Sequence, residues 1–308
     1  MEVIRTTQTQ LARKKRSILG SKKMLVYVMF TIPALLLYIG FFFYPTLMGF
    51  NYSLTNWDGM ARTYKYIGLD NYLAIFKDTR FLHSLGFTFK YTLIVVILKI
   101  TLALGLAMLL TTNLRFRGLF RSIYFFPAVL SLITIGLIFN EIFLTILPAI
   151  GEALGIEALS RNILGNKDTA LYGIIIANVW HGVAVPMVIF MAGLASVPKD
   201  LHEAATIDGA SRSQRFVSIT LPFLIPMLNV NLVLIIKGGL TVFDSIVAMT
   251  DGGPGTSTES IGFLIYRHGL LENKFGYATA ESIFIFALIA LISFVQMKWL
   301  SKKEVGQQ

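Results

Sequence analysis

The chain has 308 residues, 55% of them hydrophobic and only 14% charged, whereas a soluble domain carries about a quarter charged residues. Long apolar runs separate the charges, which indicates a polytopic membrane protein, and the absence of cysteine excludes disulfides, thiolate metal sites and cysteine nucleophiles. The net charge of +10 comes largely from Lys and Arg at the ends of the apolar runs, so we expect no nucleic-acid partner.

Residues 1–23 form a basic segment in which seven Lys and Arg residues accompany a single acid, Glu2. The apolar run that follows, Met24 to Tyr44, makes about 31 Å of helix at 1.5 Å per residue, enough to cross a bilayer. No small-residue cleavage site follows it, so we predict a retained first span rather than a signal peptide. The basic residues then predict that this tail is cytoplasmic.

Five further spans are predicted from the remaining apolar runs. They cover residues 91–112, 122–139, 171–195, 221–249 and 282–300, and the region 24–300 is interpreted as one transmembrane domain. Of the 27 Lys and Arg residues, 16 then fall in inner segments and 8 in outer segments. This asymmetry predicts an all-α membrane protein with six transmembrane helices and both termini cytoplasmic, including the tail 301–308.

A polar loop, residues 198–220, separates the fourth and fifth predicted spans. Asp200 is predicted to cap a helix that begins at Leu201, and Glu203 lies three residues later, as in a capping box. Gly209 is predicted to end this helix, because glycine adopts positive φ without steric cost.

The same loop helix presents small side chains on one face. The i, i+3, i+4 spacing groups Leu201, Ala204, Ala205 and Asp208. Such a face fits deep into a groove on another protein. Ser211 and Gln214 predict a second capping box, for a helix that runs to about Ser218.

Three short motifs in and after this loop resemble the EAA loop of membrane subunits of bacterial ABC importers. They are Glu203-Ala204-Ala205, Asp208-Gly209-Ala210 and Ile219-x-Leu221-Pro222. A lone Glu-Ala-Ala is a weak signal, but here the full spacing lies between two predicted spans. In that family the loop forms a coupling helix that inserts into a cleft on the cytoplasmic ATPase. The resemblance therefore implies that Glu203, Ala204, Ala205, Asp208 and Gly209 couple this chain to an ATPase.

A second resemblance, to the carbohydrate branch of these importers, lies in and after the fifth predicted span. The Phe243-Asp244 pair precedes the turn Thr250-Asp251-Gly252-Gly253-Pro254, as in that branch. Gly276-Tyr277-Ala278 and Tyr124-Phe125-Phe126-Pro127 also fit. Residues 25–300 as a whole resemble the larger type of membrane subunit in maltose and multiple-sugar importers. The chain lacks the extra N-terminal spans and large outer domain of the maltose subunit.

This resemblance implies a type I ABC importer permease fold in a bacterial cytoplasmic membrane. The implied partners are a second homologous permease, two copies of an ATPase, an extracellular substrate-binding (lipo)protein and a sugar. ATP and Mg²⁺ are expected on the ATPase, and no cofactor on this chain, whose sequence contains no phosphate-binding Gly-x-x-x-x-Gly-Lys-Ser/Thr motif. The substrate pathway is expected near seven residues: Ile235, Lys237, Gly238, Gly239, Val242, Phe243 and Asp244.

Charged and histidine residues within the spans leave alternatives open. Lys237 fits either a polar pathway or an ion pair with Asp244, seven residues later, and Lys99 is expected to snorkel. His181 is expected to hydrogen-bond a neighbouring helix rather than relay protons. The four histidines are isolated in the sequence, so no metal site is predicted.

Two other functions compete with the importer. One is a proton-coupled secondary carrier that uses His181, Lys237 and Asp244. The other is a membrane enzyme acting on lipid-linked sugars, whose expected cluster of acids near a membrane face is absent from the sequence. A neutral oligosaccharide is the favoured substrate, and Lys237 leaves an acidic or phosphorylated sugar as the alternative.

Overall fold

The computed structural model describes residues 24–112 and 115–300, and its regular structure there is helical apart from one isolated antiparallel bridge between Thr55 and Tyr66. After the helix that opens at Met24, the elements are η1 (Ile39–Phe43), α2 (Tyr44–Tyr52), α3 (Asp70–Ile75), α4 (Thr79–Thr111), α5 (Arg117–Phe125), η2 (Phe126–Val129), α6 (Leu132–Glu141), η3 (Ile142–Ile146), α7 (Leu147–Leu154), α8 (Glu157–Ser160), α9 (Ala170–Gly182), α10 (Ala184–Ser196), α11 (Lys199–Ile207), α12 (Arg212–Arg215), η4 (Phe216–Thr220), α13 (Leu221–Leu240), α14 (Asp244–Met249), α15 (Ile261–Tyr266), η5 (Arg267–Leu271) and α16 (Phe275–Leu300).

Within the described residues, five continuous helices are long and apolar enough to cross a membrane. They are Met24–Tyr52, Thr79–Thr111, Leu132–Leu154, Arg212–Leu240 and Phe275–Leu300. The pair α9 and α10, bent by 45°, provides a sixth span if it is counted as one. The predicted all-α membrane fold is therefore confirmed. The tails 1–23 and 301–308 lie outside the described residues.

The spans differ in extent from those predicted. The third is Leu132–Leu154 rather than 122–139, because Pro127 lies in the short η2 turn and the chain becomes extended at Ser131 before α6. The fifth ends at Leu240 rather than 249, since the helix breaks before α14. The second and sixth begin earlier, at Thr79 and Phe275.

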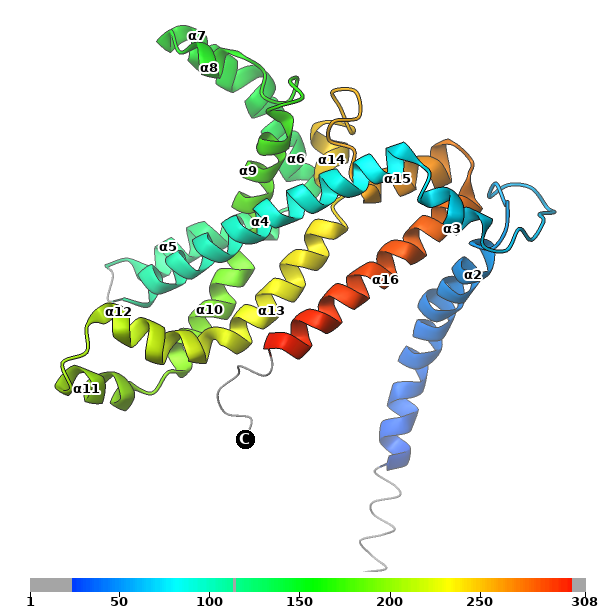
Figure 1. The fold of residues 1–308 in the computed structure, drawn as a ribbon. Helices are drawn as coiled ribbons and strands as arrows, with labels where there is room; N and C mark the ends of the chain where they lie inside the picture. Colours follow the sequence, from blue (N-terminus) through cyan, green and yellow to red (C-terminus); the bar gives the residue numbers. More distant parts are fainter. Residues whose placement is uncertain (1–23, 113–114, 301–308) are drawn as a thin grey trace, which may run out of the picture.

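Helix α4 lies at the centre of the bundle and packs against α9, α10 and α13, while α13 also packs against α16 (Figure 1). Its buried face includes Ala103 and Ala107, which contribute to a cluster with Met187 and Phe190 of α10. Small residues permit close approach of helices in a membrane, where van der Waals packing replaces the hydrophobic effect. The bundle thus depends on one long helix against which α9, α10 and α13 all pack.

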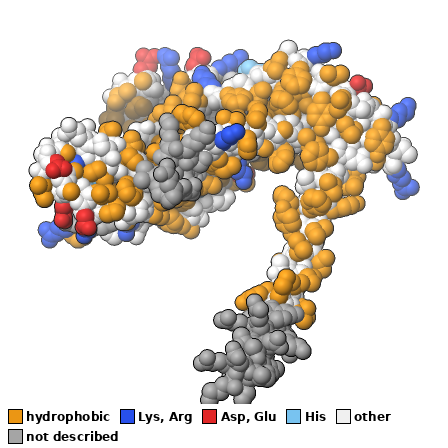
Figure 2. Space-filling model, turned by 60° about the horizontal axis from the view of Figure 1, so that its bottom comes forward, with side chains coloured by type: hydrophobic (Ala, Val, Ile, Leu, Met, Phe, Trp, Pro, Cys, Tyr) orange, Lys and Arg blue, Asp and Glu red, His pale blue; other side chains and the backbone are white. Residues whose placement is uncertain are grey.

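The first span, Met24–Tyr52, stands apart from the rest of the bundle (Figure 1). None of its most apolar 18-residue window is buried, and it contacts the bundle through α2 against α16. Hydrophobic side chains cover it along its length in Figure 2. This helix offers a long apolar face to lipid or to another membrane protein.

A polar network ties three elements together at the end of the bundle opposite α11. The guanidinium of Arg80, in the first turn of α4, donates to both carboxylate oxygens of Glu259, at 2.7 and 2.6 Å. Glu259 is fully buried, and Arg80 also donates to Glu272 at 2.8 Å. The paired residues are 179 and 192 positions apart, so the network fixes the start of α4 against the segment around α15.

Glu272 lies between η5 and α16, outside the spans. Lys274 donates to it at 2.8 Å, and this bond together with that from Arg80 lowers the pKa of Glu272 to about 2. A carboxylate whose folded pKa is lowered contributes stability at pH values above its ordinary pKa. That contribution is lost as the pH falls through the folded value, here between about 4.5 and 2.

A second polar contact lies beside this network. The imidazole Nδ1 of His268 is 3.0 Å from both carboxylate oxygens of Glu281, and both side chains are buried. The Tyr277 hydroxyl donates to Asp78 Oδ2 at 3.0 Å, and Asp78 also caps α4. These contacts hold the first turns of α16 against η5 and α4.

We predict that Glu259→Ala lowers the free energy of unfolding by about 3 kcal/mol. This is the lower end for breaking a buried ion pair, because Arg80 is partly exposed and keeps Glu272 as a partner. The matched control is Glu157→Ala, which removes an exposed i, i+4 partner of Arg161 and should change little. The measurement is the thermal unfolding midpoint of each purified variant in detergent. Equal midpoints would show that the network is not needed for stability.

Candidate functional site

Helix α11 begins at Lys199, with Pro198 at the N-cap position, two residues earlier than predicted. No side chain caps it, so the predicted capping box of Asp200 and Glu203 is wrong. The reason is that proline with φ −62° suits a helix start, which places Asp200 inside the first turn. Its carboxylate still favours the positive end of the helix dipole, and Glu203 is exposed and free to contact a partner.

The end of α11 at Gly209 is as predicted from the sequence. Gly209 has φ +75°, and the Ala210 amide donates to the Ala205 carbonyl at 2.9 Å across it. The capping box predicted at Ser211 and Gln214 is confirmed, with bonds of 2.8 and 3.3 Å. From there the helix continues through η4 into α13, so the segment Arg212–Leu240 is one long helix joined to α11 by a short turn.

Helix α11 projects from the bundle and contains no buried residue (Figure 1). Two of its apolar side chains are solvent-exposed in this chain, Leu201 at 42% and Ile207 at 86%. Beside Gly209 lies a hollow of about 330 Å³ whose lining includes Ala205, Asp208 and Gln214. The helix and this hollow together form an exposed surface on a polar loop between two spans.

The residues expected to form the substrate pathway separate into two groups. Ile235 and Val242 are buried in the cluster formed by α4, α9, α13 and α14. Gly239 is buried against α4, because a Cβ there would lie 2.7 Å from Oγ1 of Thr92. Gly238, one residue earlier, has no atom near such a Cβ and faces outward with Lys237. The pathway assignment itself stays a prediction.

Lys237 and Asp244 are not an ion pair among the described residues. The alternative that placed them two turns apart on one helix is wrong, because α13 ends at Leu240 and α14 starts at Asp244. Lys237 instead lies at the edge of an apolar cavity of about 410 Å³ between α13, α15 and α16. The ring of Phe243 lies 5.3 Å from that of Tyr266.

His181 contacts a neighbouring segment, as expected, but the partner lies in an extended turn rather than in a helix. Its Nε2 lies 3.2 Å from the carbonyl oxygen of Leu130, which joins α9 to the segment before α6. The expectation that Lys99 snorkels is wrong: its ammonium packs against Gly182, within the bundle.

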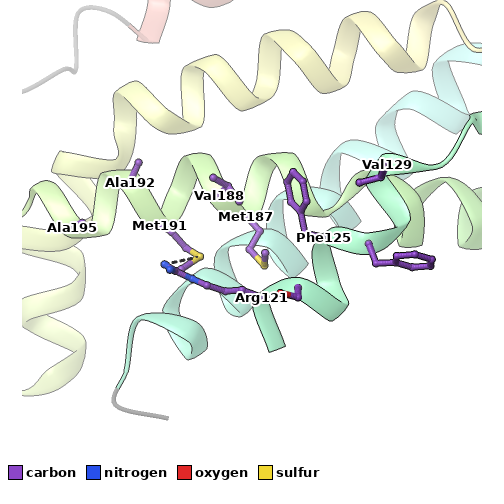
Figure 3. Close-up of a pocket in the computed structure, with 10 residues that line it drawn as sticks. Arg121, Phe125, Val129, Met187, Val188, Met191, Ala192 and Ala195 are labelled. Carbon is purple, nitrogen blue, oxygen red and sulfur yellow. Dashed lines mark hydrogen bonds between the residues drawn. The ribbon is translucent and has the colours of Figure 1, made fainter. Parts of the chain in front are cut away.

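A cavity of about 700 Å³ that the sequence did not predict lies between α5, η2 and α10 (Figure 3). Apolar side chains such as Phe125, Val129 and Met187 line it, and Arg121 reaches across to the Met191 sulfur at 3.9 Å. Phe126 and Val129 are 61% and 73% exposed, so the groove is open laterally. Its residues come from two segments about 60 positions apart, which no local pattern brings together.

Comparison with known proteins gives concordant matches. Residues 99–305 match the family described as binding-protein-dependent transport system inner membrane component. The multiple sugar-binding transport system permease protein MsmF of Streptococcus mutans is 40% identical, over 90% of this chain and 95% of its own length. The probable starch degradation products transport system permease protein AmyD of Thermoanaerobacterium thermosulfurigenes is 31% identical, over 91% and 95%.

Among solved structures, a chain of the bacterial alginate ABC transporter in complex with an alginate pentasaccharide-bound periplasmic protein has the same fold. Its TM-score is 0.73 at 22% identity, covering 90% of this chain and 93% of that one.

We predict that Gly239→Ala destabilises the protein while Gly238→Ala does not. The added methyl at position 239 would clash with Thr92 of α4, and such overpacking costs about 1–3 kcal/mol. At position 238 the methyl meets open space and favours the helix. The thermal unfolding midpoints of the two variants provide the measurement. A Gly239→Ala protein as stable as Gly238→Ala would contradict the close packing of α13 on α4.

Proposed function

This chain belongs to the family of binding-protein-dependent transport system inner membrane components, and we propose that it forms one of two homologous permease subunits of an ATP-driven saccharide importer. As a permease of this family it is a multi-pass protein of the cytoplasmic membrane and is not itself an enzyme. ATP and Mg²⁺ bind to a separate ATPase. The proposal of a saccharide substrate is supported by the sugar permeases among its relatives.

The observation that carries the proposal is the projecting helix α11. It holds Glu203, Ala204 and Ala205 on an exposed polar loop and is followed by Gly209 at positive φ. Such a surface is accessible to a partner outside the membrane, and the EAA resemblance gives that partner as the ATPase. Because α11 connects directly to α10 and through Gly209 to the long helix ending at Leu240, displacement of α11 moves both spans.

The other partners follow from the same arrangement. The isolated first span, Met24–Tyr52, is suited to pack on a second permease, since this chain leaves its apolar surface uncovered. With six spans and α11 inside, both termini are cytoplasmic. An extracellular binding protein delivers the saccharide at the opposite end of the bundle. This role is supported by the family's dependence on binding proteins and by the fold shared with the alginate importer.

The proton-coupled carrier is disfavoured by family membership and by geometry. Lys237 and Asp244 are on separate helices and unpaired with each other, and His181 already contacts the Leu130 carbonyl. A proton relay needs such groups within hydrogen-bonding reach of one another.

The function is tested by reconstituting the chain with its partner permease, ATPase and binding protein in proteoliposomes. Uptake is measured for labelled neutral and acidic oligosaccharides, with maltotriose and alginate trisaccharide as representatives. We expect uptake that requires ATP hydrolysis and the binding protein. Uptake driven by a pH gradient without ATP would support the carrier and refute this proposal.

We predict that Gly209→Val strongly reduces saccharide uptake, because a β-branched residue resists φ +75° and shifts α11 relative to α12. Gly68→Val is the matched control: Gly68 has φ +63°, is equally free of neighbours and lies in the loop before α3. The two variants should lose similar stability. Only Gly209→Val should lose saccharide uptake while it retains ATP hydrolysis. Equal uptake by both would show that residues 199–209 are a passive loop.

A further inference from the structure

Helix α4 directs one continuous face into the bundle. The buried members of this face include Phe81, Ser84, Thr88, Tyr91, Val95, Ala103, Ala107 and Leu110. Lys99 lies on the same face, four residues after Val95 and four before Ala103. A cation therefore lies on the buried face of α4 between two apolar residues of that face, Val95 and Ala103.

The Lys99 side chain ends at the break in the fourth span. Gly182 is the last residue of α9, where the chain bends by 45° into α10. A Cβ on Gly182 would overlap the Lys99 Nζ and lie 2.8 Å from its Cε. The ammonium thus fills the space that any side chain at position 182 would occupy.

No acid compensates this charge within the described part of the chain. Lys99 makes no salt bridge there, and neither its own helix α4 nor α9, α10 and α13, which pack against α4, contain Asp or Glu. The carboxyl end of α9 carries about half an elementary negative charge, so it compensates the ammonium only in part. An ammonium has three donors, and a cation inside a membrane protein is expected to face a partner or a polar cavity.

We propose that Lys99 is a substrate-contacting residue whose ammonium donates hydrogen bonds to oxygen atoms of the saccharide as it passes the break between α9 and α10. This inference rests on the proposed function and adds a specificity-determining side chain to it. Hydroxyl oxygens of neutral sugars and carboxylates of uronic acids are both suitable acceptors. Thr92, two turns before Lys99 on the same face, contacts Gly239, so this face also borders the α13 segment expected to line the pathway.

The test uses Lys99→Cys in the complete complex, since this chain has no native cysteine. Aminoethyl methanethiosulfonate rebuilds an ammonium on the new thiol, whereas methyl methanethiosulfonate leaves a neutral group. Lys90→Cys is the matched control, because Lys90 lies on the exposed face of the same helix. Wild-type complex treated with each reagent controls for thiols on the partners.

We expect Lys99→Cys to reduce ATP-dependent uptake about tenfold, as for a lost hydrogen bond to a charged group. The aminoethyl reagent should restore it, and the methyl reagent should not. Lys90→Cys should resemble wild type throughout. Reduced uptake of maltotriose would show that Lys99 donates to sugar hydroxyls. Reduced uptake of alginate trisaccharide alone would show that it donates to a carboxylate. Unchanged uptake of both by Lys99→Cys would overturn the proposal.

A protection experiment distinguishes substrate contact from a purely structural role of the Lys99 charge. Saccharide-loaded binding protein with ATP and vanadate should slow modification of Cys at position 99 but not at position 90. Rescue by the aminoethyl reagent without such protection would show that Lys99 only stabilises the break in the span. If Lys99→Cys fails to assemble, Gly182→Ala keeps the lysine but displaces its ammonium, and unchanged uptake by this variant would also overturn the proposal. Absence of ATP-dependent uptake by wild type would instead refute the proposed function.

Discussion

The hydrocarbon core of a membrane provides no hydrogen-bond partners, and the rest of this structure depends on that constraint. Within the described residues the spans are helices, and where a span breaks, other groups satisfy the freed backbone. Between α13 and α14, the Val242 carbonyl accepts from the Ser260 hydroxyl at 2.7 Å, and the Thr241 amide donates to the Lys237 carbonyl at 3.1 Å. Breaks of this kind are tolerated only where protein surrounds them, so they fix neighbouring helices relative to one another.

The same constraint directs how the helices pack and where the polar loop can lie. Glycines permit close contacts between spans, as where Gly193 of α10 meets Met227 of α13 and Gly239 meets Thr92. Helices α10 and α13 are in direct contact, so their adjacent ends lie at the same end of the bundle. The polar loop that connects them must therefore lie at that end, outside the hydrocarbon core. Helix α11 is therefore held at one end of two packed spans, and in the proposed complex movement of a bound ATPase would reach both.

Local sequence patterns predicted much of this arrangement. The apolar runs gave the helical membrane fold, and Gly209 and the Ser211–Gln214 capping box were placed correctly. Other features depended on competition between neighbouring residues. Pro198 displaced the expected cap at Asp200, and the break after Leu240 separated Lys237 from Asp244. The Arg80–Glu259 pair joins residues 179 positions apart, and the contact of Lys99 with Gly182 likewise depends on tertiary packing, so no periodicity reveals either.

The central claim is that α11 is a cytoplasmic coupling helix covered by an ATPase. Ile207→Cys tests it most directly, since this side chain is 86% exposed and the chain has no other cysteine. A membrane-impermeant maleimide should label the variant in vesicles that expose the cytoplasmic face and not in vesicles of the opposite orientation. Added ATPase subunits should block this labelling. Labelling from the extracellular side, or labelling that the ATPase leaves unchanged, would contradict the account.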